Sequence, residues 1–110
     1  MLRNPRFPGG HTHSRLNEYL AEMAVDRRDL NATMHFYDQA FASKSNPIYP
    51  YRQAVLLESA GLADAARDYA ARSRQALRLK EQLQYPELAG RLAELEARLR
   101  PRPHAAQVQP

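Results

Sequence analysis

Small residues recur in this chain at a separation of 33 positions, and this internal similarity constrains the fold more than any other feature. Two helices approach closely only where their side chains are short. A period of this length is typical of stacked units, each of which buries its apolar side against a neighbour. The sequence therefore predicts two similar helical hairpins packed side by side. The matching pairs are Ala21 with Ala54, Ala32 with Ala65, Thr33 with Ala66, and Ala40 with Ser73.

The segments around these positions favour helices. Ala, Leu, Arg, Glu and Gln dominate, and β-branched residues nowhere alternate with polar ones. Ser14 and Asp29 are competent N-caps, Pro50 and Pro86 suit the first turn of a helix, and Gly61 suits a left-handed cap. We predict an all-α fold of antiparallel helical hairpins. The expected helices cover about residues 14–27, 30–42, 50–60, 63–84 and 86–100.

The apolar spacing in each helix predicts which side is buried. In the first helix, Leu16, Tyr19, Leu20 and Met23 form one stripe, which we take as its inner side. In the third helix, residues 54–57 are apolar on nearly every side, so we expect this helix in the middle of the structure. The expected inner residues of the second helix are Leu30, Thr33, Met34, Tyr37, Ala40 and Phe41, and those of the fourth are Ala66, Tyr69, Ala70, Ser73 and Leu77.

The fifth helix carries a seam of leucines at Leu88, Leu92, Leu95 and Leu99, spaced four, three and four residues apart. This seam predicts packing against one partner. It could cover the open end of the second hairpin as a capping helix, or it could pair with a second copy of the chain in a homo-oligomer like a short coiled coil. Two heptads are few for a stable isolated coiled coil, so we favour the cap.

The pattern of small and aromatic residues resembles the tetratricopeptide repeat. The residues that carry the resemblance are Ala21, Thr33, Tyr37 and Ala40 in the first copy, and Ala54, Gly61, Ala66, Ala70 and Ser73 in the second. The sequence departs from the family's pattern because neither hairpin opens with tryptophan and Arg28 stands where the turn glycine is expected. The resemblance implies two repeats and a C-terminal capping helix in an α-α superhelix over residues 14–100. Prolines and glycines crowd the start of the chain and prolines its end, so we expect flexible tails at 1–13 and 101–110.

Proteins of that family generally bind peptide segments in a concave groove lined by the first helix of each hairpin. Position by position, the resemblance implies a lining of Glu18, Glu22, Asp26, Tyr51, Val55 and Glu58. At 100° per residue the three carboxylates of the first helix share one side, away from its apolar stripe, and Tyr51, Val55 and Glu58 also cluster. An apolar floor with an acidic wall suits a basic or amphipathic protein segment. A solvated acidic helix face beside a core tyrosine is the alternative interpretation.

A basic surface on the fourth helix offers another function. The chain carries a net charge of +4, and Arg67, Arg74 and Arg78 lie in one narrow sector of that helix. A nucleic acid or a phosphorylated partner could bind there. Acidic residues are interspersed, and no aromatic residues alternate with the arginines as a single-strand binder would prefer. We therefore favour protein binding over nucleic-acid binding.

Several other classes of function find no support in the sequence. The chain has no cysteine, which excludes disulfides, thiolate zinc sites and cysteine nucleophiles. It has no long uncharged apolar run for a membrane span and no apolar core of a secretory signal near its start, so we expect a cytoplasmic protein. His11 and His13 lack an evident third metal ligand, and the four glycines form no phosphate-binding loop. We predict a non-catalytic adaptor without metal or cofactor.

Overall fold

Five helices make up the part of the chain that the computed structural model describes, residues 10–79 and 85–100. Their bounds are α1 Gly10–Asp26, α2 Leu30–Ser43, α3 Ile48–Ser59, α4 Ala63–Leu79 and α5 Pro86–Leu99. These residues contain no strand, so the predicted all-α fold is confirmed. None of these helices is long and apolar enough to cross a membrane.

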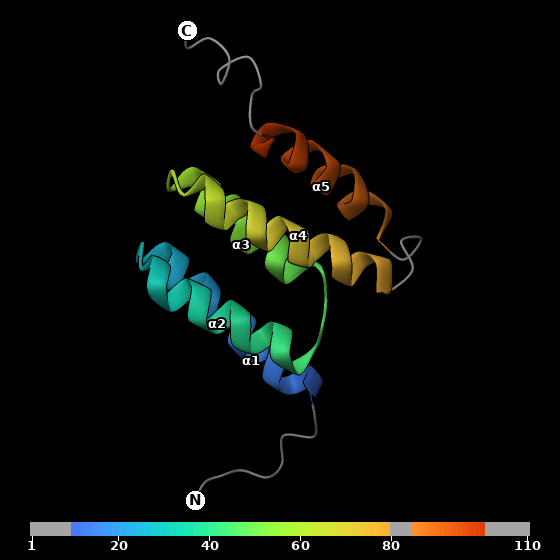
Figure 1. Cartoon of the computed structure of the whole chain (residues 1–110). Coiled ribbons are helices and arrows are strands. Elements are labelled where there is room, and N and C mark those ends of the chain that lie inside the picture. The colour runs from blue at the N-terminus through green and yellow to red at the C-terminus, as the bar shows by residue number, and fades with distance from the viewer. Residues whose placement is uncertain (1–9, 80–84, 101–110) are drawn as a thin grey trace, which may run out of the picture.

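The helices form two antiparallel hairpins followed by a single helix. α1 packs on α2, and α3 packs on α4. The hairpins meet through α2 and α3, while α5 lies on α4 and also reaches α3. Figure 1 shows the three layers in sequence, with α1 and α2 at one side of the array and α5 at the other. As predicted, α3 lies in the middle, because it contacts α2, α4 and α5.

The turns inside the two hairpins have the same backbone geometry. Arg28 and Gly61 are 33 residues apart and both adopt the left-handed conformation, with φ of 61° and 81°. A left-handed residue just after a helix lets the next amide bond back to the last turn. Those bonds are Asp29 N to Ala24 O and Leu62 N to Leu57 O, each 2.9 Å. The 33-residue register predicted from small side chains is therefore also the register of the backbone.

The recurring small residues lie inside the array. Ala21, Ala54 and Ala66 have no exposed surface, and Ala40 and Ser73 are equally buried. Ser73 Oγ also donates a hydrogen bond of 2.9 Å to Pro47 O, in the link between the hairpins. Short side chains at these positions let the helices approach closely, as the sequence predicts.

Most of the predicted helix ends are confirmed. Asp29 Oδ1 accepts a hydrogen bond of 3.0 Å from Ala32 N, so it caps α2 as expected. Pro50 lies in the first turn of α3, and Pro86 opens α5. The predicted N-cap Ser14 is wrong, because α1 already begins at Gly10 and Ser14 is buried inside it. Residues 10–13 are thus helical, whereas 1–9, 80–84 and 101–110 lie outside the described residues.

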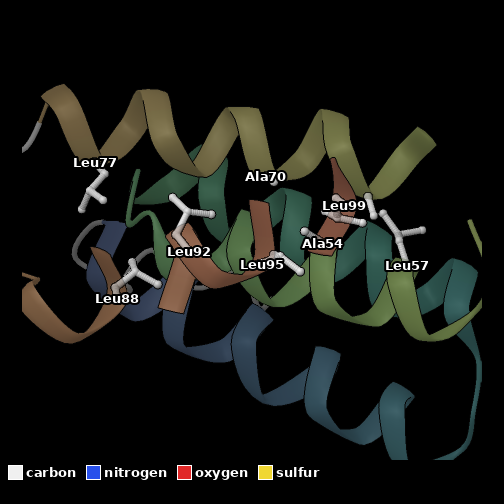
Figure 2. Close-up of a cluster of buried hydrophobic side chains, with 9 residues drawn as sticks. Ala54, Leu57, Ala70, Leu77, Leu88, Leu92, Leu95 and Leu99 are labelled. Carbon is white, nitrogen blue, oxygen red and sulfur yellow. The ribbon is translucent and has the colours of Figure 1, made fainter. Parts of the chain in front are cut away.

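The largest buried cluster joins α3, α4 and α5 (Figure 2). The leucine seam of α5 enters this cluster, and its four side chains are 0% to 6% exposed. The leucine seam therefore packs against α3 and α4 of the same chain, which is the predicted arrangement of a capping helix. Pairing of two copies through these leucines would require α5 to leave its own core.

The predicted inner side of α1 is wrong. Leu16, Tyr19 and Met23 are 45%, 59% and 40% exposed. The buried side of α1 consists of small residues, Ser14, Ala21 and Ala24, which allow α2 to pack closely. Helical spacing identifies an apolar stripe, but it does not say whether a neighbour lies beside it, and no described helix precedes α1 to cover this one.

Candidate functional site: a groove between the first helices of the two hairpins

A hollow of about 510 Å³ opens between α1 and α3, and α2 closes one side of it. Three aliphatic side chains and two tyrosines provide most of its surface. Two carboxylates and one guanidinium supply the charged groups. The lining residues are Glu22, Val25, Asp26, Tyr37, Tyr51, Arg52, Val55 and Leu56. Because α1 and α3 are the first helices of the two hairpins, this hollow occupies the position expected for the groove.

Four of the six predicted groove residues meet in this hollow. Glu22 and Asp26 come from α1, and Tyr51 and Val55 come from α3. Glu18 lies beside the hollow, where Arg52 and Tyr49 bind its carboxylate. The sixth predicted residue, Glu58, does not line the hollow.

Glu58 instead joins α3 to α5. Its carboxylate accepts two hydrogen bonds of 3.0 Å from Arg98, one from Nε and one from Nη2. These bonds stabilise the charged form and lower the pKa of Glu58 below its usual 4.5. The Glu58 side chain therefore helps to hold α5, the capping helix, against α3. Sequence spacing alone could not show this, because the contact depends on how α5 crosses α3.

Arg52 is the principal residue of the site that sequence reasoning missed. Its Nη1 lies 2.7 Å from Glu18 Oε2 and 4.0 Å from Glu22 Oε2, so it links α3 to α1. Burial disfavours the charged guanidinium, but the hydrogen bond that Arg52 donates to Glu18 and the interactions with Tyr37 together outweigh it, and the pKa of Arg52 lies above its usual value. Tyr49 also donates a hydrogen bond of 3.3 Å to Glu18. The wall near Glu18 is therefore a paired cluster and not a free acidic surface.

Tyr37 forms part of the inner wall and is only 3% exposed. Burial raises the pKa of its phenol, so the hydroxyl stays protonated at neutral pH. A protonated phenol at the base of a groove can donate a hydrogen bond to a bound peptide carbonyl.

The acidic charge of the groove is concentrated at the carboxyl end of α1. Glu22 and Asp26 are one turn apart and exposed, and the last turn of α1 contains no basic residue. Like charges at this spacing repel each other, and a helix C-terminus carries partial negative charge of its own. This end of the groove therefore presents two exposed carboxylates, with Arg27 and Arg28 directly after them in the chain.

The basic surface predicted on α4 is largely occupied by contacts within the chain. Arg67 Nη1 donates a hydrogen bond of 2.8 Å to Leu99 O, and its Nη2 bonds Asp64. Arg74 binds Glu96 through hydrogen bonds of 3.1 Å and 2.6 Å. Two of the three arginines thus fasten α4 to its own neighbours, which leaves Arg78 as the exposed member of the set.

Comparison of the chain with protein-family models, with curated proteins and with solved structures finds no match. Among the described residues, no three His, Asp or Glu side chains lie close enough together to hold a metal ion. The groups available in the groove are an apolar floor, two phenols, a paired guanidinium and two exposed carboxylates, which are means of binding a polypeptide segment.

Proposed function

We propose that this chain is a non-catalytic protein-interaction module that binds a segment of a partner protein in the groove between α1 and α3. The observation that carries the proposal is the hollow of about 510 Å³ lined by the first helices of both hairpins. Its floor combines Val25, Val55 and Leu56 with two tyrosines, so it offers apolar contact and hydrogen bonding together. Such surfaces bind protein segments whose apolar side chains fit the floor.

The charges of the groove favour a basic or amphipathic segment. Arg52 is already paired with Glu18, whereas Glu22 and Asp26 remain exposed at the rim. A lysine or arginine of the partner at this end would relieve the repulsion between the two carboxylates. An adjacent apolar side chain would reach the floor beside Val55.

We further propose that the array is of the tetratricopeptide type. The shared turn geometry at Arg28 and Gly61 supports this assignment, as does the burial of small residues 33 positions apart. Tyr37 and Ala70, which occupy the same position in the two copies, are each 3% exposed. The groove between first helices is the peptide site that this resemblance implies.

Selection from a random-peptide library on the purified chain tests the function. We expect the selected peptides to carry a lysine or arginine close to a large apolar residue. The variant Glu22→Arg/Asp26→Arg should bind them about tenfold more weakly, because two attractive contacts become repulsive.

A matched control reverses two exposed carboxylates elsewhere, in the variant Asp68→Arg/Glu94→Arg. It changes the net charge by the same amount, and it should leave peptide binding unchanged. Equal loss of binding in the two variants would mean that overall charge and not the groove attracts the peptides. Selection of peptides without basic residues would contradict the proposed partner class.

A further inference from the structure

A second hollow, of about 440 Å³, adjoins the groove at the end where the hairpins turn. Val25 of α1 and Leu56 of α3 line both hollows. Ser59 and Ala60, at the end of α3, line the second hollow only. The turns of both hairpins lie at this end of the array (Figure 1). The surface open to a bound segment therefore continues from the groove to the hairpin turns.

The length of this surface sets the size of the segment that it can hold. The two hollows together follow α3 from Tyr51 to Ala60. At the rise of an α-helix this distance is about 14 Å. An extended peptide rises about 3.3 Å per residue, so about four or five residues span it. A short segment can therefore contact Glu22 and Asp26 and also reach the turn of the first hairpin.

Arg28 is the cation of the second hollow. It lines this hollow and is exposed, and among the residues that the structure describes no carboxylate forms an ion pair with it. Asp29 lines the same hollow, but its Oδ1 accepts a hydrogen bond from Ala32 N and caps α2. Arg27 is exposed but does not line the hollow. Arg28 therefore presents its positive charge to an occupant of this hollow.

The backbone at Arg28 also indicates a use for its side chain. Arg28 and Gly61 occupy equivalent turns, with φ of 61° and 81°. Glycine adopts this conformation without strain, whereas a side chain crowds the backbone. Residues other than glycine that are held in such conformations cluster at positions that contact ligands. Arginine is thus unfavourable for the stability of this turn and well placed to contact a segment in the hollow.

We propose that Arg28 binds an acidic side chain of the segment that occupies the groove. This inference rests on the proposed function, because it adds a second charged contact to the same bound segment. A basic residue of the segment lies at Glu22 and Asp26, and its acidic residue lies at Arg28. The partner is therefore a segment of mixed charge, in which the two charged residues lie within about five positions of each other.

The peptides selected from the random library on the full chain are the probe. We expect them to carry an aspartate or glutamate within about five positions of the basic residue. Replacing this acidic residue by its amide should weaken binding to the wild type about fivefold, which is the upper range for an exposed ion pair. The same change in the peptide should not affect binding to Arg28→Gln, because the partner of the carboxylate is already removed.

The neighbouring arginine provides a matched control. Arg27→Gln and Arg28→Gln remove the same charge from adjacent exposed residues. Arg28→Gln should weaken peptide binding about fivefold, whereas Arg27→Gln should leave it unchanged. Arg28→Lys keeps the charge and should retain most of the affinity. Equal effects of the two glutamine variants would show that the overall charge of the turn is responsible, and would overturn the assignment to Arg28.

Arg28→Gly separates binding from folding. It removes the crowded side chain, so it should raise the urea midpoint of unfolding while it weakens peptide binding about fivefold. A loss of binding in a more stable chain cannot result from misfolding. Unchanged binding in this variant would overturn the inference.

The contact of Arg28 and the groove itself fail in different ways. If Glu22→Arg/Asp26→Arg loses the peptides and Arg28→Gln binds them fully, the proposed function stands and the contact of Arg28 is wrong. Selection of peptides that have a basic but no acidic residue has the same meaning. If the library yields no binding peptide, both proposals are wrong.

Discussion

Arg28 holds a backbone conformation that suits glycine better than any other residue. Its φ of 61° matches the 81° of Gly61 at the equivalent turn of the second hairpin. A side chain in this conformation crowds the following carbonyl, whereas glycine avoids that contact. The first hairpin therefore adopts the same turn geometry as the second, although it has arginine where the second has glycine.

We expect Arg28→Gly to raise the free energy of unfolding by about 0.5 to 1 kcal/mol. Urea denaturation measures this change. Gly61→Ala is the opposite test, because an added methyl group there meets no atom within 4 Å and only the backbone conformation opposes it. It should lower stability by about 1 kcal/mol. If Arg28→Gly is no more stable than the wild type, the turn strain at this residue is absent.

Single residues also show where sequence reasoning succeeds and where it fails. Ala21 and Ala54 could be recognised as buried because their spacing repeats and small side chains permit close packing. Tyr19 was wrongly predicted to be buried, because its spacing fits an apolar stripe and periodicity does not show what covers that stripe. The role of Arg52 was not predicted, because a single arginine forms no sequence pattern. Only the approach of α3 to α1 brings it to Glu18.

At the scale of whole helices, the docking of α5 combines apolar packing with ion pairs at its edges. Its leucines enter the main core, while Arg98 binds Glu58 of α3 and Glu96 binds Arg74 of α4. The cap and its leucine seam could be predicted from the sequence. The partners of Glu58 and Glu96 could not, because they follow from the angle at which α5 crosses the hairpin.

The Glu58 contact predicts a dependence of stability on pH. Arg98 lowers the pKa of Glu58 in the folded chain, so the contact stabilises the fold above the unfolded value near 4.5. This contribution is lost as the pH falls through the lower folded value. Glu58→Gln removes it, so the difference in unfolding free energy between wild type and variant should shrink from about pH 6 to about pH 3. A difference that stays constant over this range would show that the contact does not titrate.

At the scale of the molecule, Gln53 couples the two hairpins. It is 1% exposed, and its Nε2 donates to Met34 O at 3.2 Å and to Asp38 Oδ1 at 2.9 Å. In an array, each unit is stabilised by its contacts with the next. Among the described helices, the first hairpin packs mainly on the second, whereas the second also packs on α5. Loss of this coupling should therefore affect the two hairpins unequally.

We expect Gln53→Ala to lower the unfolding free energy by about 1 to 3 kcal/mol, because a buried side chain and its two hydrogen bonds to α2 are lost. Hydrogen exchange should become faster in α1 and α2 than in α4 and α5. Gln75→Ala, at an exposed position of α4, is the control and should leave both hairpins unchanged. Uniform acceleration across all helices would indicate that the array unfolds as one unit.

The number, type and order of the helices could all be predicted from the sequence, because the caps at Asp29 and Gly61 and the repeating small residues act locally. Four of the six proposed groove residues follow from the same register. The exposure of the α1 stripe could not be foreseen, since it depends on the ends of the array and not on any one helix.

The position of α5 gives the array a direction. One side of the stack is closed by this helix, whose leucines turn inward, and the opposite side exposes the apolar stripe of α1. The outward side of α5 instead exposes charged residues such as Arg91 and Glu94. The two sides of the described array therefore differ in polarity, apolar at α1 and charged at α5.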